Sequence, residues 1–247
     1  LRVTAQSAGG LVIHDIAANG QMLATRDDLN RIMLVHAPGA TSDVDMSFRE
    51  LSEPVDMSSD GQTVIFTESG TAAGSNYQVC MRRTDGSPVV VLGEGGAVDL
   101  SDDGRWVLAG IFPNRVILYP TGAGQSVELK TNSLELVIDA RWMPGARQVL
   151  LIAGRKDEAS RCYLVDVPDG VPHAITRPGV GWVLPSPDGK RMILQQSDLT
   201  WWTAGFDSSS VRTPAPGLGP EDFVTAWQPD GRGVIVHHRV GEDAARD

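Results

Sequence analysis

Short apolar segments alternate with polar turns along the whole of this 247-residue chain. Six of the turns share one pattern, with an apolar segment on either side; five of them close with Asp-Gly or Asn-Gly, and the fourth is Pro144-Gly145-Ala146. Asp-Gly and Asn-Gly favour a positive φ, so each of these turns predicts a hairpin between two strands. The third residue of each turn serves as an anchor, and the six anchors are Gly20, Gly61, Gly104, Ala146, Gly189 and Gly231.

The anchors recur with a nearly constant period. Successive anchors lie 41, 43, 42, 43 and 42 residues apart. A period in the low forties, with a strand on each side of the turn, is typical of a β-propeller blade. We therefore predict an all-β, six-bladed propeller that spans residues 1–247 as one domain and contains no helix. The predicted innermost strands are residues 11–16, 52–57, 97–100, 138–143, 180–184 and 223–227.

The two ends of the chain fall short of a complete ring. Only the polar residues 239–247 follow the second strand of the sixth unit, whereas residues 1–5 look like an outer strand without a blade. We expect residues 1–5 to join the last blade, because this would close the ring and cover an exposed edge. Two alternatives remain open: the native protein extends beyond one or both ends, or the open last blade pairs with another copy in a homodimer.

Composition narrows the classes of partner. The formal net charge of −10 disfavours nucleic acid or an anionic membrane surface, and it permits cations or basic peptides. No apolar run approaches the ~18 residues of a membrane helix, so we expect no membrane insertion. Cys80 and Cys162 are the two cysteines, and both fall in predicted strands, where a buried free thiol is expected.

Two stretches resemble the repeat of TolB-type, WD40-like (PD40) propellers. They are residues 58–68, with the sequence SSDGQTVIFTE, and the run Arg141-Trp142-Met143-Pro144 followed by Val149-Leu150-Leu151. Residues 11–17, 76–88 and 92–95 are similar to the propeller region attached to bacterial, notably acidobacterial, serine/threonine protein kinases. The resemblance implies a sensor region of a longer protein, extracytoplasmic if the kinase is membrane-anchored and cytoplasmic otherwise. The chain has no Gly-rich loop, catalytic Asp loop or Asp-Phe-Gly of a kinase, so we do not predict phosphoryl transfer.

An acidic residue stands five positions before each of the first three anchors. These residues are Asp15, Asp56 and Asp99, and Arg141 holds the same position in the fourth unit. Equivalent positions of a propeller surround one axis, so we expect all four side chains in the central channel. Three carboxylates there could hold a divalent cation such as Ca²⁺ or Zn²⁺. Alternatively, each Asp accepts backbone hydrogen bonds and locks adjacent blades together, and Arg141 neutralises the charge without a metal.

A second group of candidates lies toward the other end of the innermost strands. Glu53 and Asp222 belong to an acidic channel mouth that would attract cations, with His237 and His238 at a strand end nearby. His14 precedes Asp15 on the first innermost strand, and it could share a site with His237 or His238 across the ring closure. The alternative is ordinary solvated loop charge and structural histidines.

Two functions from different classes follow from these patterns. The first is a binding or sensing module that takes a small molecule or a protein on the propeller face. The second is a metal-assisted hydrolase of a phosphotriester, sulfate or carboxylic ester, in which the aspartates hold the metal and His14 or His237 acts as base. The sequence has no Gly-x-Ser-x-Gly elbow, so a serine nucleophile is not expected.

Overall fold

The structure, a computed structural model, describes residues 10–27, 31–131, 133–206 and 212–238. Within these residues nearly all regular structure is β-strand, and the one helical element is a 3-10 turn, η1 (Thr71–Ala73). The all-β prediction is therefore confirmed. No helix in the described part of the chain is long and apolar enough to cross a membrane.

Four sheets within the described ranges are complete four-stranded antiparallel blades. In each of them the strands lie side by side in chain order, as hairpin-connected strands do. The blades are β5 (Ser52–Met57), β6 (Thr63–Glu68), β7 (Gln78–Arg83) and β8 (Val90–Glu94); β9 (Gly96–Leu100), β10 (Trp106–Ile111), β11 (Arg115–Pro120) and β12 (Val127–Glu128); β13 (Leu136–Trp142), β14 (Gln148–Gly154), β15 (Arg161–Asp166) and β16 (His173–Ala174); β17 (Val180–Pro185), β18 (Met192–Gln196), β19 (Trp201–Ala204) and β20 (Thr213–Pro214).

Three further sheets in the described residues are two-stranded. They are β1 (Gly10–Ile16) with β2 (Met22–Asp27), β3 (Leu34–Val35) with β4 (Val44–Asp45), and β21 (Asp222–Trp227) with β22 (Val234–His238). The strands β1, β5, β9, β13, β17 and β21 match the six predicted innermost strands to within two residues at either end. The count of six blades is consistent with this arrangement and stays a prediction.

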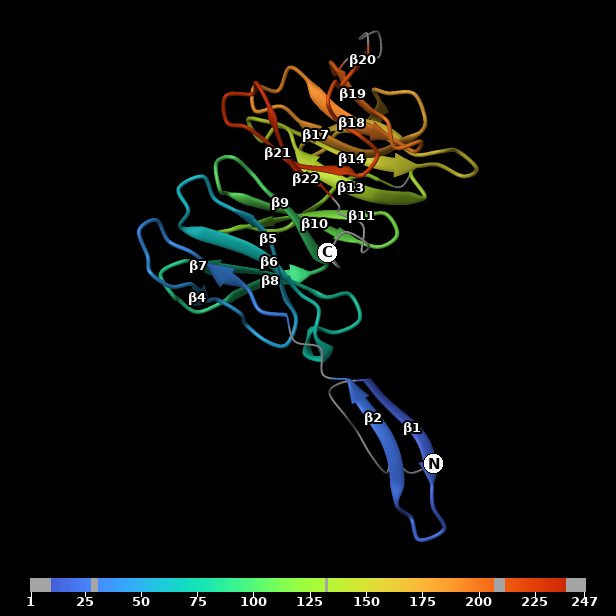
Figure 1. Cartoon of the computed structure of the whole chain (residues 1–247). Helices are drawn as coiled ribbons and strands as arrows, with labels where there is room; N and C mark the ends of the chain where they lie inside the picture. The colour runs from blue at the N-terminus through green and yellow to red at the C-terminus, as the bar shows by residue number, and fades with distance from the viewer. Residues whose placement is uncertain (1–9, 28–30, 132, 207–211, 239–247) are drawn as a thin grey trace, which may run out of the picture.

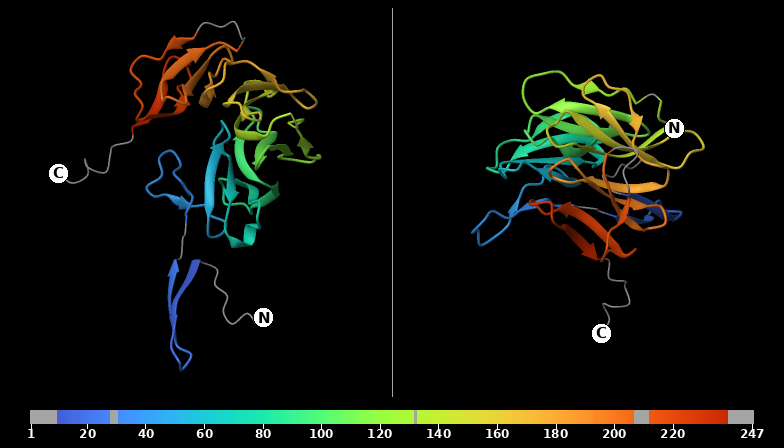
Figure 2. Two further views of the ribbon diagram at one scale, coloured as in Figure 1. Left: turned by 90° about the vertical axis from the view of Figure 1, so that its right-hand side faces the viewer. Right: turned by 90° about the horizontal axis from the view of Figure 1, so that it is seen from above.

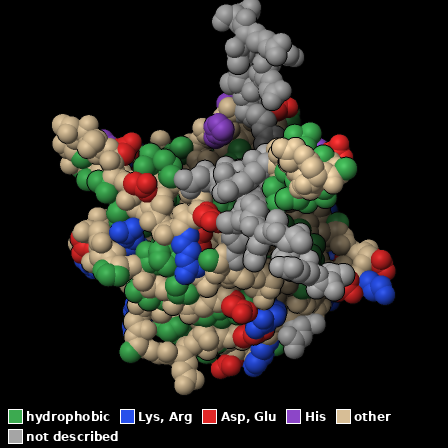
Figure 3. Space-filling view, turned by 90° about the horizontal axis from the view of Figure 1, so that it is seen from below, with side chains coloured by type: hydrophobic (Ala, Val, Ile, Leu, Met, Phe, Trp, Pro, Cys, Tyr) green, Lys and Arg blue, Asp and Glu red, His purple; other side chains and the backbone are tan. Residues whose placement is uncertain are grey.

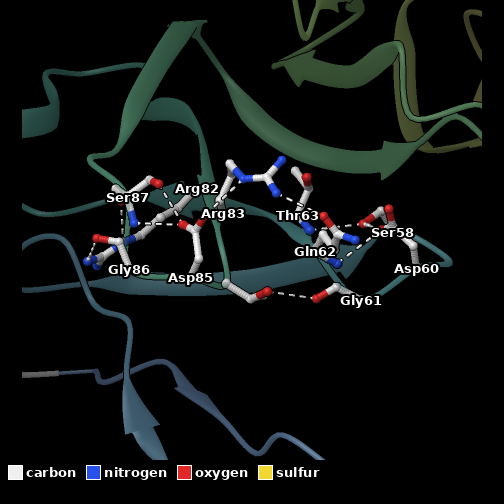
Figure 4. A network of polar contacts seen from close by, with 11 residues as sticks. Ser58, Asp60, Gly61, Gln62, Thr63, Arg82, Arg83, Asp85, Gly86 and Ser87 are labelled. Atoms are coloured by element: carbon white, nitrogen blue, oxygen red, sulfur yellow. Dashed lines mark hydrogen bonds and ion pairs between the residues drawn. The ribbon is translucent and has the colours of Figure 1, made fainter.

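The anchor turns close as the sequence pattern predicts. Gly61 has a φ of 68°, in the left-handed region that favours glycine, and its N–H donates to the carbonyl of Ser58 at 2.7 Å. Asp60 accepts hydrogen bonds from the Ser58 hydroxyl and from the Gln62 N–H within the same turn (Figure 4). Arg83 then reaches back from β7 to the Gln62 side chain, which ties the third strand of the blade to the turn (Figure 4).

Neighbouring blades are held together by apolar side chains that alternate along the strands. Leu151 of β14 packs toward the preceding blade, in a cluster with Leu108 and Trp142. The next residue back, Leu150, points to the other face and packs with Val183 of the following blade. The β13–β16 blade therefore has two buried faces, and its stability depends on both neighbours.

The first blade departs from this arrangement. Its outer strands β3 and β4 lie against the β5–β8 blade, where Met33 and Met46 are buried with Phe66. Its inner strands β1 and β2 form a separate hairpin that projects away from the body of the molecule (Figures 1 and 2). The body itself follows an arc from β5 around to β21 and β22 (Figure 2, left). The prediction that residues 1–5 close the last blade lies outside the described residues.

Candidate functional site

The inner ends of five blades enclose a funnel on the axis of the arc. This cavity has a volume of about 500 Å³. It is lined where the innermost strands β5, β9, β13, β17 and β21 run into their anchor turns. The lining residues are 55–59, 98–102, 141, 142, 144, 184–187 and 225–227. Asp56, Asp99 and Arg141 are among them, so the structure brings together three of the four residues expected in the channel.

A β-bulge fixes the direction of each aspartate. In β5 the bulged residue is Val55, and in β9 it is Val98, so an aspartate follows each bulge directly. Each aspartate then accepts the N–H of the next residue through Oδ1, from Met57 to Asp56 at 2.7 Å and from Leu100 to Asp99 at 3.1 Å. The bulge and this bond leave the second carboxylate oxygen free to point at the next blade.

That second oxygen joins adjacent blades. Oδ2 of Asp56 accepts the N–H of Leu100 at 3.1 Å, and Oδ2 of Asp99 accepts the N–H of Trp142 at 2.7 Å. Each bond runs from one innermost strand to the next one along the chain. For these two residues, the alternative in which aspartates lock adjacent blades through backbone hydrogen bonds is therefore observed. Hereafter we call this contact the interblade latch.

The latch also places two carboxyl groups close together. Burial, together with the negative charge of nearby Asp56, raises the pKa of Asp99 to about 7. The Trp142 N–H bond and the charge of Arg141 act in the opposite direction, but they do not outweigh burial. Asp99 is therefore partly protonated near neutral pH, and a positively charged ligand group could replace that proton.

Arg141 has its own carboxylate partner, which the sequence analysis missed. Its guanidinium lies 2.9 Å from Asp139 and donates to the carbonyl of Ala140 at 2.9 Å. Asp139 follows the bulged Ile138, just as Asp56 follows Val55, and burial raises its pKa against the opposing charge of Arg141. Asp139 is thus the bulge aspartate of its blade. It was overlooked because it stands seven residues before its anchor instead of five.

The remaining channel candidates lie away from the funnel. Asp15 belongs to the projecting hairpin, where it accepts the Ile16 N–H at 2.8 Å. His14 is the bulged residue beside it, and its Nε2 lies 2.8 Å from the hydroxyl of Thr25. In the described part of the chain no group of three or more His, Cys, Asp or Glu side chains could hold a metal ion. The metal role of Asp15, Asp56 and Asp99 stays a prediction.

The candidates at the opposite end of the strands form separate pairs. Glu53 makes an ion pair of 2.7 Å with Arg31. Nδ1 of His238 lies 2.8 Å from Asp222, and a hydrogen bond from the Gly219 N–H, followed by that from His238, lowers the pKa of Asp222. His237 lines a cavity of about 310 Å³ together with Asp222. His14 lies on the hairpin and does not contribute to these contacts.

Comparison with known proteins agrees with this architecture. No family model matches the sequence, and no curated protein matches it. Among solved structures, a protein assigned as TolB from Agrobacterium tumefaciens has a TM-score of 0.63 at 13% identity, covering 97% of this chain and 94% of that one. TolB from Acinetobacter baumannii has a TM-score of 0.62 at 16% identity, over 85% of this chain and 54% of that one.

A third neighbour is the β-propeller domain of Cps50 (Swd1) from Myceliophteria thermophila. Its TM-score is 0.56 at 15% identity, over 76% of this chain and 62% of that one. Identities this low establish the fold and leave function to be argued from the site. The chain therefore has the fold of a TolB-like, WD40-like β-propeller.

Proposed function

We propose that this propeller is a binding module and that its ligand site is the funnel. The observation that carries the proposal is the cavity of about 500 Å³ at which five innermost strands meet, with polar side chains from β5, β9, β13 and β21 in its lining. Ligand pockets commonly have volumes of ~300–1,000 Å³, and this cavity falls in that range with polar and apolar residues mixed in its lining. Propeller neighbours and a lack of recognisable catalytic motifs fit the same class of function.

The polar groups favour a ligand that brings hydrogen-bond donors or a positive charge. Asp56, Asp99 and Asp102 line the funnel, and the guanidinium of Arg141 is already paired with Asp139. A cationic group that enters the funnel would replace the proton on Asp99, so its binding would strengthen as pH rises through about 7. The ligand class that follows is an amine-bearing small molecule or a basic segment of a partner protein.

No observation on the described residues favours metal-assisted hydrolysis over binding, and that hypothesis remains a prediction from the sequence. The attachment to a kinase likewise depends on sequence resemblance alone. On that basis we propose that the propeller senses a ligand for a longer protein. This larger proposal has its own test, because it requires a kinase region in the same polypeptide.

The funnel is tested with a ligand screen and one blocking variant. Amines, basic peptides and neutral or acidic controls are first compared by the rise in melting temperature that each produces. Ser59→Arg then places a bulky cation at an exposed position of the lining, and Ser133→Arg puts the same change at an exposed serine that does not line the funnel. We expect Ser59→Arg to abolish the rise and Ser133→Arg to leave it unchanged. A ligand whose effect survives Ser59→Arg would refute the funnel as the site.

A further inference from the structure

The funnel has an unfilled sector. Its lining comes from β5, β9, β13, β17 and β21, whereas β1, the remaining innermost strand, contributes nothing to it. The arc leaves β3 and β4 beside the β5–β8 blade at one end and β21 with β22 at the other (Figure 2, left). The element missing between them is a two-stranded inner half-blade, which is what β1 and β2 form.

The hairpin itself lacks a covering on both faces. Val12 and Ile13 are neighbours on one strand and so point to opposite faces, yet they are 53% and 47% exposed. Across the ladder, Leu23 is 66% exposed. Figure 3 views the molecule from the side toward which the hairpin projects. On that face of the molecule, apolar side chains are interspersed with acidic and basic ones. A hairpin with apolar residues on both faces is built for the inside of a propeller, between two other sheets.

The surfaces that border the unfilled sector are complementary in character. On the β5 side, Val55 and Met57 are exposed. On the other side, Phe223 of β21 and Ile235 and Val236 of β22 are exposed as well. Comparable positions on the complete blades, such as Leu150 and Leu151, are fully buried between neighbours.

The latch supplies a specific register for docking. Asp15 follows a bulge and bonds the next N–H through Oδ1, as Asp56 and Asp99 do. No second partner of Asp15 occurs among the residues that the structure describes. The N–H that would receive its Oδ2 belongs to Met57, which bonds to its own Asp56 and to nothing from a preceding blade within the described ranges. In the next latch along, the N–H of Leu100 bonds to both Asp99 and Asp56.

We propose that the unfilled sector binds the β1–β2 hairpin of a second copy of this chain, so that two molecules exchange hairpins. A second copy is favoured because the hairpin extends outward from its own body, where another molecule can receive it (Figure 1). Each molecule then carries both the donor and the receiving surface, so a two-fold dimer satisfies both copies at once. Asp15 of the partner subunit bonds the Met57 N–H and becomes the third carboxylate of the funnel. This proposal does not depend on which ligand the funnel takes.

The oligomeric state gives the first test. Light scattering after size-exclusion chromatography, over a wide range of concentrations, should show a dimer of twice 26.4 kDa. Ile13→Asp puts a charge into the exchanged interface and should raise the dissociation constant by about tenfold or more. Val171→Asp makes the same kind of change at a residue that is 67% exposed elsewhere, and it should leave the dimer intact. A monomer at every concentration, or a dimer that tolerates Ile13→Asp, would overturn the proposal.

A cross-link separates exchange from closure by a chain's own hairpin. In the complete blades, Asp102 accepts the N–H of Gly145 across the blade boundary at 3.0 Å. The same register pairs Ala18 with Asp60. Chains carrying Ala18→Cys and chains carrying Asp60→Cys are mixed and treated with a short bismaleimide, which forms a thioether with each thiol.

Burial raises the pKa of both native thiols, Cys80 and Cys162, to about 12, so they should not react. We expect covalent dimers in the mixture and fewer of them when either variant is treated alone. In the double variant, exchange predicts cross-linked dimers. An internal cross-link in a species with the mass of one chain would show closure by the chain's own hairpin and would refute exchange.

Discussion

The β13–β16 blade and the β1–β2 hairpin begin from the same sequence pattern and reach different environments. Both have an apolar innermost strand, a bulge, an aspartate after the bulge and an anchor turn. In the blade, Leu150 and Leu151 are completely buried, whereas Val12 and Ile13 of the hairpin are about half exposed. The local hydrogen bonds are satisfied in both cases. The difference shows that local pattern makes the hairpin, while contact with two neighbouring blades makes the buried core.

The largest loss of stability should come from a cavity in the core of the β13–β16 blade. Leu151→Ala removes a fully buried side chain between two blades and should lower the free energy of unfolding by about 3 kcal/mol. Ile13→Ala in the hairpin should cost less than about 0.5 kcal/mol when the chain is dilute enough to exist as single copies. Chemical denaturation of both variants measures the two losses. Equal losses would mean that the hairpin is packed in the single molecule.

The interblade latch gives the next comparison. Asp99→Ala removes the side-chain acceptor of the Trp142 N–H, and an unpaired buried donor is costly, whereas the Leu100 N–H keeps its bond to Asp56. We expect a loss of about 2 kcal/mol in the free energy of unfolding. Asp15→Ala makes the same change in the hairpin, where the Ile16 N–H can turn to water, so the loss in a dilute sample should be small. If Asp15→Ala destabilised single copies as much as Asp99→Ala, the latch would already be formed there.

Much of this architecture was predictable, because the repeat transfers geometry from one unit to the next. The anchors located every innermost strand to within two residues, and the recurring aspartates pointed to a shared role at the axis. Asp139 escaped because the bulge in β13 falls at Ile138, eight residues before its anchor, whereas Val98 in β9 lies six before its own. A bulge inserts a residue without a distinct sequence signal, so counting from the turn misaligns everything beyond it.

The separation of β1 and β2 from β3 had no signal in the sequence. The turn at Gly20 and the aspartate at Asp15 follow the same rules as those of complete blades. Where a half-blade lies depends on contacts between segments far apart in the chain, which local periodicity does not report. Trp142 and Leu151, by contrast, were predictable as core residues, because apolar strands flank their strands on both sides.

A third experiment uses pH to examine what the neighbouring blade does to a carboxyl group. Burial raises the pKa of Asp99 to about 7, while an unfolded chain would have a value near 3.9. Between these two pH values the folded protein binds more protons than the unfolded chain, so this group makes the free energy of unfolding fall as pH rises. An asparagine side chain cannot titrate, so Asp99→Asn should remove that contribution.

The measured quantity is the difference in unfolding free energy between Asp99→Asn and the unaltered protein. We expect this difference to move in favour of the variant by about 1–2 kcal/mol from pH ~4 to pH ~8. Taking the difference cancels the other carboxylates, such as Asp85, whose pKa is lowered to about 2 by bonds from Ser87 and Arg83. A difference that stays flat across this range would show that Asp99 is ionised throughout.

The smallest effect concerns the turns, where the two regions are most alike. Asp103 accepts the hydroxyl of the buried Ser101 at 2.6 Å and the N–H of Arg105 at 3.0 Å, and the Ser101 bond is the main cause that lowers the pKa of Asp103. In the hairpin, Asn19 accepts the N–H of Gln21 at 3.1 Å, with no buried group beneath it.

Asp103→Ala should therefore lower the melting temperature by about 1–3 °C, because a buried hydroxyl loses its acceptor. Asp103→Asn keeps an acceptor oxygen and should recover most of the loss. Asn19→Ala should change the melting temperature by less than about 1 °C, since the turn it stabilises is not coupled to a packed blade. A larger fall for Asn19→Ala than for Asp103→Ala would reverse the comparison, because it would make the hairpin turn part of the cooperative core.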